Sequence, residues 1–145
     1  MATTITPATL TVTIDESVIL NGKTYGNSNT LTIANINEVD QRILTIPTSE
    51  VTVVNYGAAV AAGTFVRTAV SYLRITNKDD TNFVSLKIAD SSEQYWVKLE
   101  PGKSFELHNG LIETANTFSA WADISAISAI ADTAAVDLEY FVATT

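Results

Sequence analysis

The 145-residue sequence contains no cysteine, one histidine and three prolines. Without cysteine there is no disulfide and no thiolate metal site, and nothing indicates the redox compartment. No window of 18 apolar residues occurs, so we expect no transmembrane helix. The opening segment, MATTITPATL, lacks the basic stretch and long apolar run of a signal peptide, so we expect none.

Positive charge is also scarce. Eight Lys and Arg residues stand against sixteen Asp and Glu, which gives a net charge of −8 at pH 7. Nucleic acids and anionic lipid surfaces are bound through clusters of basic residues. We therefore expect neither nucleic acid nor a membrane among the partners. The same charge makes isolated copies of the chain repel one another.

Hydrophobic and β-branched residues are abundant. Hydrophobic residues make up 46% of the chain, charged residues only 17%, and threonine occurs 21 times. Apolar and polar residues alternate in many short runs, such as TLTVTI and AAVDLEYFVA, with turn residues between them. This pattern is typical of strands with one buried face. It predicts an all-β chain: a jelly-roll-like antiparallel β-sandwich of about 8–10 short strands.

The domain organisation follows from the same pass along the chain. Residues 1–9 are polar and include Pro7, which suggests a flexible N-terminal arm, and residues 10–145 are expected to form a single domain. Asn21-Gly22 between two β-prone runs predicts a hairpin. The Ala/Ile-rich stretch 119–131 is ambiguous, because isoleucines three residues apart suit a short helix and a bulged strand about equally.

Chemistry-bearing motifs are few. The single histidine, His108, has the parity of the polar side of its strand, and an exposed histidine is the simpler interpretation. Asp137 and Glu139 share a strand face, which glycoside hydrolysis could use, although a charged outer face is the commoner meaning. The NKDDTN turn lacks the glycine and glutamate of a calcium loop. We therefore expect no catalytic residue, no metal and no cofactor.

Three aromatic residues lie on the polar sides of their strands. Phe83 shares parity with Lys87, Trp96 with its neighbouring charges, and Phe141 with Glu139. Exposed aromatics often need no explanation, and a loop covering the sheet would also account for them. Aromatic anchors within a polar rim are, however, typical of protein–protein hot spots. We predict Phe83, Trp96 and Phe141 as interface residues.

Residues 72–143 resemble a known group of proteins. The shared features are L-x-I-x-N before a polar turn, the hairpin LEPGKSFEL, the segment ADISAISAIAD and the closing strand AVDLEYFV. Together they are similar to small β-sandwich structural proteins of tailed bacteriophages, notably cyanophages and other marine phages. The resemblance implies a non-enzymatic virion component, made in the host bacterial cytoplasm, and offers no catalytic residues to transfer.

The leading hypothesis is a capsid decoration (cement) protein that binds and stabilises the shell surface. Its partners would be the major capsid protein or other virion proteins, at the capsid surface or neck, and copies of itself in a trimer or dimer. A head–tail, tail or fibre accessory protein is an alternative within the virion. A carbohydrate-binding module that stacks sugars on the same aromatics is a second class. A small hydrolase using Asp137, Glu139 or His108 is the third.

Overall fold

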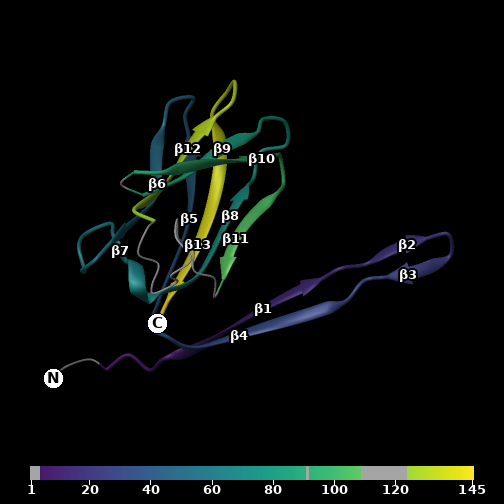
Figure 1. Cartoon of the computed structure of the whole chain (residues 1–145), viewed down its shortest axis with the longest axis horizontal. Helices are drawn as coiled ribbons and strands as arrows, with labels where there is room; N and C mark the ends of the chain where they lie inside the picture. The colour runs from purple at the N-terminus through teal and green to yellow at the C-terminus, as the bar shows by residue number, and fades with distance from the viewer. Residues whose placement is uncertain (1–3, 91, 109–123) are drawn as a thin grey trace. The chain divides into compact units, whose positions relative to one another are not determined.

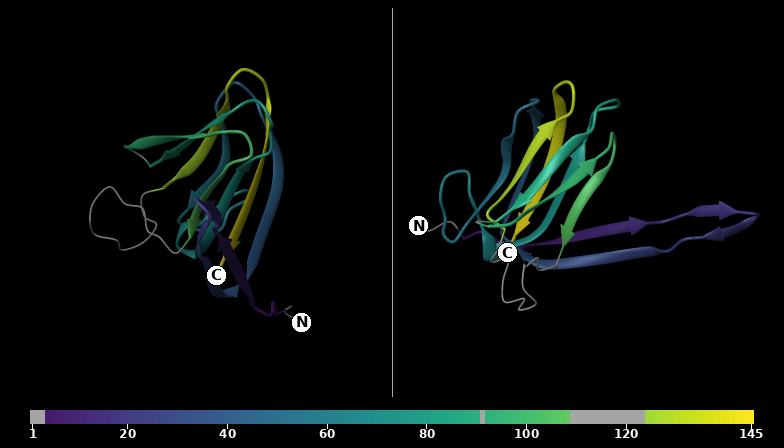
Figure 2. Two further views of the ribbon diagram at one scale, coloured as in Figure 1. Left: turned by 90° about the vertical axis from the view of Figure 1, so that its right-hand side faces the viewer. Right: turned by 45° about the horizontal axis from the view of Figure 1, so that its top comes forward.

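The computed structural model describes residues 4–90, 92–108 and 124–145, and in these residues the regular structure is almost entirely β. The chain divides into two compact units: the residues up to Glu38 together with Thr145, and residues 39–144. The second unit is a sandwich of two sheets (Figure 1, Figure 2). The all-β sandwich predicted from the alternation is therefore confirmed.

The first unit is a β-ribbon (Figure 1). Its strands are β1 (Ala8–Asp15), β2 (Val18–Leu20), β3 (Lys23–Tyr25) and β4 (Ser28–Ile36). β1 pairs with β4 and β2 with β3, and one antiparallel register runs from Leu10 opposite Ile33 to Leu20 opposite Lys23. The turn at Asn21-Gly22, with φ of 51° and 77°, is the two-residue hairpin turn that this dipeptide favours.

The ribbon forms a compact unit of its own inside the segment 10–145 that we predicted as a single domain. Residues 10–145 were expected to form one domain, but residues 10–38 belong to the first unit and the sandwich unit begins at residue 39. The physical reason is that β1 to β4 take their hydrogen-bonded partners from within the ribbon. β1 also begins at Ala8, inside the segment 1–9 that we predicted as a flexible arm.

The sandwich consists of a five-stranded and a four-stranded sheet. The five-stranded sheet has the order β10-β9-β12-β6-β7, and the four-stranded sheet has the order β11-β8-β13-β5. The strand bounds are β5 (Glu38–Ile46), β6 (Val51–Gly57), β7 (Phe65–Val66), β8 (Val70–Asn77), β9 (Val84–Ala89), β10 (Gln94–Leu99), β11 (Ser104–His108), β12 (Ala126–Ala131) and β13 (Val136–Thr144). β9 is antiparallel to β10 and β12, β12 to β6, and β8 to β11 and β13, whereas β6 and β7 are parallel.

The hydrophobic core lies between the two sheets. It takes Val84, Leu86 and Ile88 from β9, and alternate residues of β13 such as Val136 and Leu138. These are the residues that period-2 alternation placed on the inner side of each strand. Their complete or near-complete burial makes removal of apolar surface from water the main force that holds the two sheets together.

The ambiguous stretch 119–131 proves to contain a bulged strand pair. Residues 126–131 form β12, which lies between β9 and β6. Its register with β6 shifts between Ile127, opposite Val54, and Ser128, opposite Thr52. The extra residue on β6 is Val53, so Val53 and Val54 are both buried although they are adjacent. Residues 119–123 of the predicted segment lie outside the described residues.

Candidate interaction surface

Trp96 lies in β10, at the edge of the five-stranded sheet. β10 pairs with β9 so that Trp96 stands opposite Lys87, and Lys98 opposite Ser85. Alternation turns Leu99 into the core, where it is 3% exposed, while the Trp96 side chain remains 47% exposed. Trp96 thus lies on the solvent-facing side of its strand, as its alternation with the inward-facing residues of β10 predicted.

Asp90 makes several hydrogen bonds between the two strands that carry this surface. The backbone N–H of Asp90 donates to the carbonyl of Glu93 over 3.0 Å. In return, the Asp90 carboxylate accepts the backbone N–H groups of Ser92, at 2.6 Å, and Glu93. Hydrogen bonds from Glu93 and then Ser92 hold the pKa of Asp90 below its ordinary value. A turn closed by its own carboxylate keeps the register of β9 and β10 fixed at this end.

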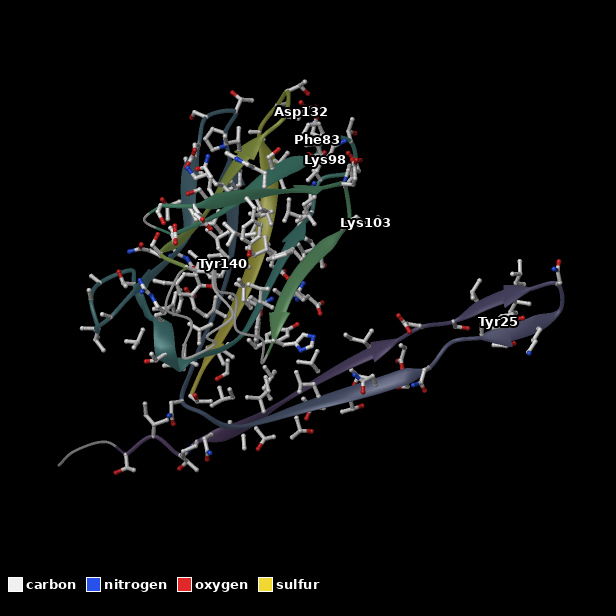
Figure 3. All side chains as sticks on the ribbon, in the orientation of Figure 1. Tyr25, Phe83, Lys98, Lys103, Asp132 and Tyr140 are labelled. Carbon is white, nitrogen blue, oxygen red and sulfur yellow. The ribbon has the colours of Figure 1, made fainter. Side chains whose placement is uncertain are left out.

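Two lysines make cation–π contacts with Trp96 and Phe83. Lys87 Nζ lies 5.7 Å from the ring centroid of Trp96, and Lys98 Nζ lies 4.2 Å from that of Phe83. Figure 3 labels Phe83 and Lys98. Each lysine also meets a carboxylate. Lys87 forms an ion pair with Glu50, and Lys98 Nζ lies 2.6 Å from Glu100 Oε1. We call this set the Trp96 face; its members are Glu50, Phe83, Lys87, Trp96, Lys98 and Glu100.

The Trp96 face is electrically neutral, with two lysines and two glutamates, in a chain of net charge −8. Phe83 is half-buried, and Trp96 is the large exposed group. An exposed indole surrounded by paired charges has the composition of a hot spot with a polar rim. The cation–π contacts also restrict the ring before any partner binds, which lowers the entropy lost on binding.

The outer face of the four-stranded sheet is different, because its polar groups bind one another. Arg74 Nη2 lies 2.7 Å from Glu139 Oε1, and Thr76 Oγ1 lies 2.8 Å from Ser104 Oγ. The Arg74 guanidinium holds the pKa of Glu139 below its ordinary value. Arg74 and Glu139 thus form an ion pair on this outer face, and Thr76 and Ser104 form a hydrogen bond beside it.

Phe141 lies on this second face, in β13 opposite Arg74. Its ring makes an edge-to-face contact with the buried Tyr72, at 5.9 Å between centroids. Phe83 and Trp96 therefore lie on the same side of one sheet, whereas Phe141 is on the other sheet, and the three predicted interface residues do not form one surface. Strand parity gives the side of a strand, but it does not tell which sheet the strand joins.

The residues considered for hydrolysis are not assembled into a catalytic set. Asp137 Oδ1 accepts a hydrogen bond from Thr45 at 2.8 Å, and Glu139 pairs with Arg74. His108 stands opposite Tyr72, four residues along β8 from Thr76, which faces Glu139. That spacing corresponds to roughly 13 Å along the strand, far beyond the hydrogen-bond reach that a base and its partner need.

Oxygen-rich turns were the other candidate for ion binding. Among the described residues, no group of three His, Cys, Asp or Glu side chains is arranged to hold a metal ion. The Asp79 carboxylate instead accepts the backbone N–H groups of Asn82 and Thr81, at 2.6 and 2.7 Å. Those two bonds, that from Asn82 first, hold the pKa of Asp79 below its ordinary value.

In the described part of the chain, no helix has the length and apolar character needed to cross a membrane. Comparison with models of known families, with curated proteins and with solved structures finds no match to this chain. The resemblance to phage structural proteins therefore stays a prediction.

Sequence reasoning missed the partners of the aromatic residues. Lys87 and Lys98 have the parity of Phe83 and Trp96, and this was visible in the sequence. The contribution of Glu50 was not, because it lies more than thirty residues before Lys87 and approaches only when β12 and β6 join the sheet. A pairing that depends on strand order leaves no signal in local alternation.

Proposed function

We propose that this protein is a structural component of a bacteriophage virion, a capsid decoration protein that binds the outer surface of the shell. The Trp96 face is the part that meets the shell protein. The observation that carries the proposal is the exposed Trp96 ring, held by Lys87 on a sheet whose charges are already paired. The similarity of residues 72–143 to phage structural proteins supplies the setting.

Neutrality supports a protein partner for this face. A surface that bound phosphate would present unpaired lysines, whereas Lys87 and Lys98 are each matched by a glutamate. An aromatic anchor in such surroundings gains most of its binding energy by removing apolar area from water. The surface of a protein shell offers many identical copies of one site, so copies of this chain that are linked to one another would bind it more strongly than single copies.

Co-sedimentation with purified capsids of a tailed cyanophage tests the proposal. We expect the chain to bind, and Trp96→Ala to weaken binding at least tenfold, because removal of a hot-spot tryptophan costs about 2 kcal/mol or more. Tyr95→Ala is the matched control. Tyr95 is also an exposed aromatic of β10, but it alternates to the other side of the strand.

Equal binding of Trp96→Ala and the parent chain would remove the Trp96 face from the proposal. Failure of the parent chain to bind capsids would remove the decoration role. Binding to isolated tails or necks instead would then identify the chain as a tail or head–tail accessory protein. Thermal unfolding of each variant shows whether a loss of binding reflects a loss of fold.

Carbohydrate binding is the second candidate, because an exposed indole can also serve as a stacking platform for a sugar ring. The cation–π contact with Lys87 engages one part of that ring system, which leaves less of it for a sugar. A glycan array separates the two functions. Reproducible glycan binding that Trp96→Ala abolishes, together with no binding to capsids, would favour the carbohydrate-binding role.

A further inference from the structure

The β-ribbon has one apolar and one polar face. Its register pairs even-numbered residues of the first half with odd-numbered residues of the second, so that each pair lies on one face. The apolar face carries Leu10, Val12, Ile14, Val18, Leu20, Tyr25, Leu31 and Ile33. The opposite face carries Thr11, Thr13, Thr30, Thr32 and, as its one large apolar residue, Ile19.

Burial of the apolar face is incomplete. At the base of the ribbon Ile33 is 6% exposed, and Leu10 and Leu31 are half-buried. Toward the tip the same face is open: Val18 is 56% exposed, Leu20 is 59% exposed and Tyr25 is 47% exposed. A two-stranded ribbon is marginally stable in water unless its apolar face is covered. The tip of this face therefore has the character of a surface that is covered in an assembly.

We propose that a second copy of this chain covers the tip, with the apolar faces of the two ribbons packed against each other in antiparallel orientation. The two-fold axis would pass through the Val18–Tyr25 pair. Like residues then meet at the axis, and Ile14 of each copy lies near the turn of the other. This is the self-complementary arrangement that two-fold symmetry requires.

Charge complementarity is the reason to propose a second copy of this chain as the partner that covers the tip. The chain carries a net charge of −8, so copies can approach only through a surface that does not repel itself. Between Leu10 and Ile33 the apolar face holds one acid, Glu16, and one base, Lys23. Along the ribbon, Glu16 lies two residue pairs from the Val18–Tyr25 pair in the direction of β1 and β4. Lys23 lies two residue pairs from it in the direction of the turn. Antiparallel packing about that pair brings Glu16 of each copy level with Lys23 of the other.

The exposed area sets the strength of the pairing. The face from Ile14 to the turn is roughly 27 Å long and 10 Å wide, from the rise per residue and the spacing of two strands. Two copies would bury about 550 Å² in projection, below the roughly 1,000 Å² of a stable interface. The pairing is therefore weak and reversible in dilute solution, and effective where copies are held close together.

Sedimentation equilibrium of the full chain, from about 10 µM to 1 mM, measures this pairing. We expect a monomer–dimer equilibrium that Leu20→Thr weakens at least fivefold. Ile19→Thr is the matched control: Ile19 is the more exposed residue, at 72%, but it lies on the threonine face and its replacement should leave the equilibrium unchanged. A chain that stays monomeric throughout, or equal effects of the two replacements, would overturn the proposal.

A charge exchange identifies the occupant. Glu16→Lys and Lys23→Glu should each weaken the dimer several-fold, because each places like charges opposite one another. The double variant should restore it, since the pairs reform with their signs reversed. Restoration is expected only if the partner is another copy of the same chain. If both single variants and the double variant dimerise equally, the proposed packing is wrong. The inference stands independently of capsid binding, because it is measured without capsids.

Discussion

At the scale of single residues, Asn77 contributes more than its place in a polar turn suggests. It is fully buried, and its Nδ2 donates to the carbonyls of Asn82 at 2.9 Å and Leu99 at 3.0 Å. Its Oδ1 accepts the backbone N–H of Asp79 at 2.9 Å. One side chain thus joins the turn after β8 to the end of β10. In the sequence, Asn77 looked like an ordinary turn residue or a weak calcium-ligand candidate.

We predict that Asn77→Ala lowers the free energy of unfolding by about 2–4 kcal/mol, because it leaves several buried backbone groups without partners. Urea denaturation measures the change. Thr81→Ala in the same exposed turn is the control, with an expected effect below about 0.5 kcal/mol. A similar small effect of Asn77→Ala would show that water replaces the lost hydrogen bonds.

At the scale of elements, alternation predicted which residues of sandwich strands such as β9 and β13 face inward, and Asn21-Gly22 predicted the hairpin. Alternation does not indicate which strands are neighbours in a sheet. β12 lies between β9 and β6, and β5 beside β13, but strands with the same pattern could be exchanged without violating it. The ribbon was taken for part of the sandwich for the same reason, since TLTVTI reads like any half-buried strand.

The ribbon depends on one backbone position. Gly26 has φ of +144°, and a Cβ there would lie 1.8 Å from the carbonyl oxygen of Glu16. We predict that Gly26→Ala separates β2 and β3 while β1 and β4 stay paired. Amide hydrogen exchange between Val18 and Tyr25 should become faster, with little change in the sandwich.

Gly22→Ala is the control for that experiment. Gly22 also has positive φ, but a Cβ there meets no atom within 4 Å, so its replacement should cost only about 1 kcal/mol. If exchange in β2 and β3 were the same in Gly26→Ala as in the parent chain, the ribbon would be able to relax around the added methyl group, and the close approach to Glu16 would not constrain it.

At the scale of the whole molecule, negative charge opposes contact between copies. The net charge is −8 at pH 7 and the isoelectric point is about 4.4. We predict that the second virial coefficient of the Leu20→Thr variant, measured by static light scattering, is positive at pH 7 and falls through zero as the pH approaches 4.4. A value that does not change with pH would show that apolar contacts dominate the association of whole molecules.

The strand order also has a consequence for how the chain folds during synthesis. The ribbon closes between residues 8 and 36, so it can form as soon as that short segment leaves the ribosome. β5 cannot pair with its neighbour until much later in synthesis, because that neighbour, β13, begins at Val136, about a hundred residues further along the chain. Such non-local pairing is slow. A nascent chain halted before β13 would carry a finished ribbon and an open sandwich, exposing apolar strand edges to other chains.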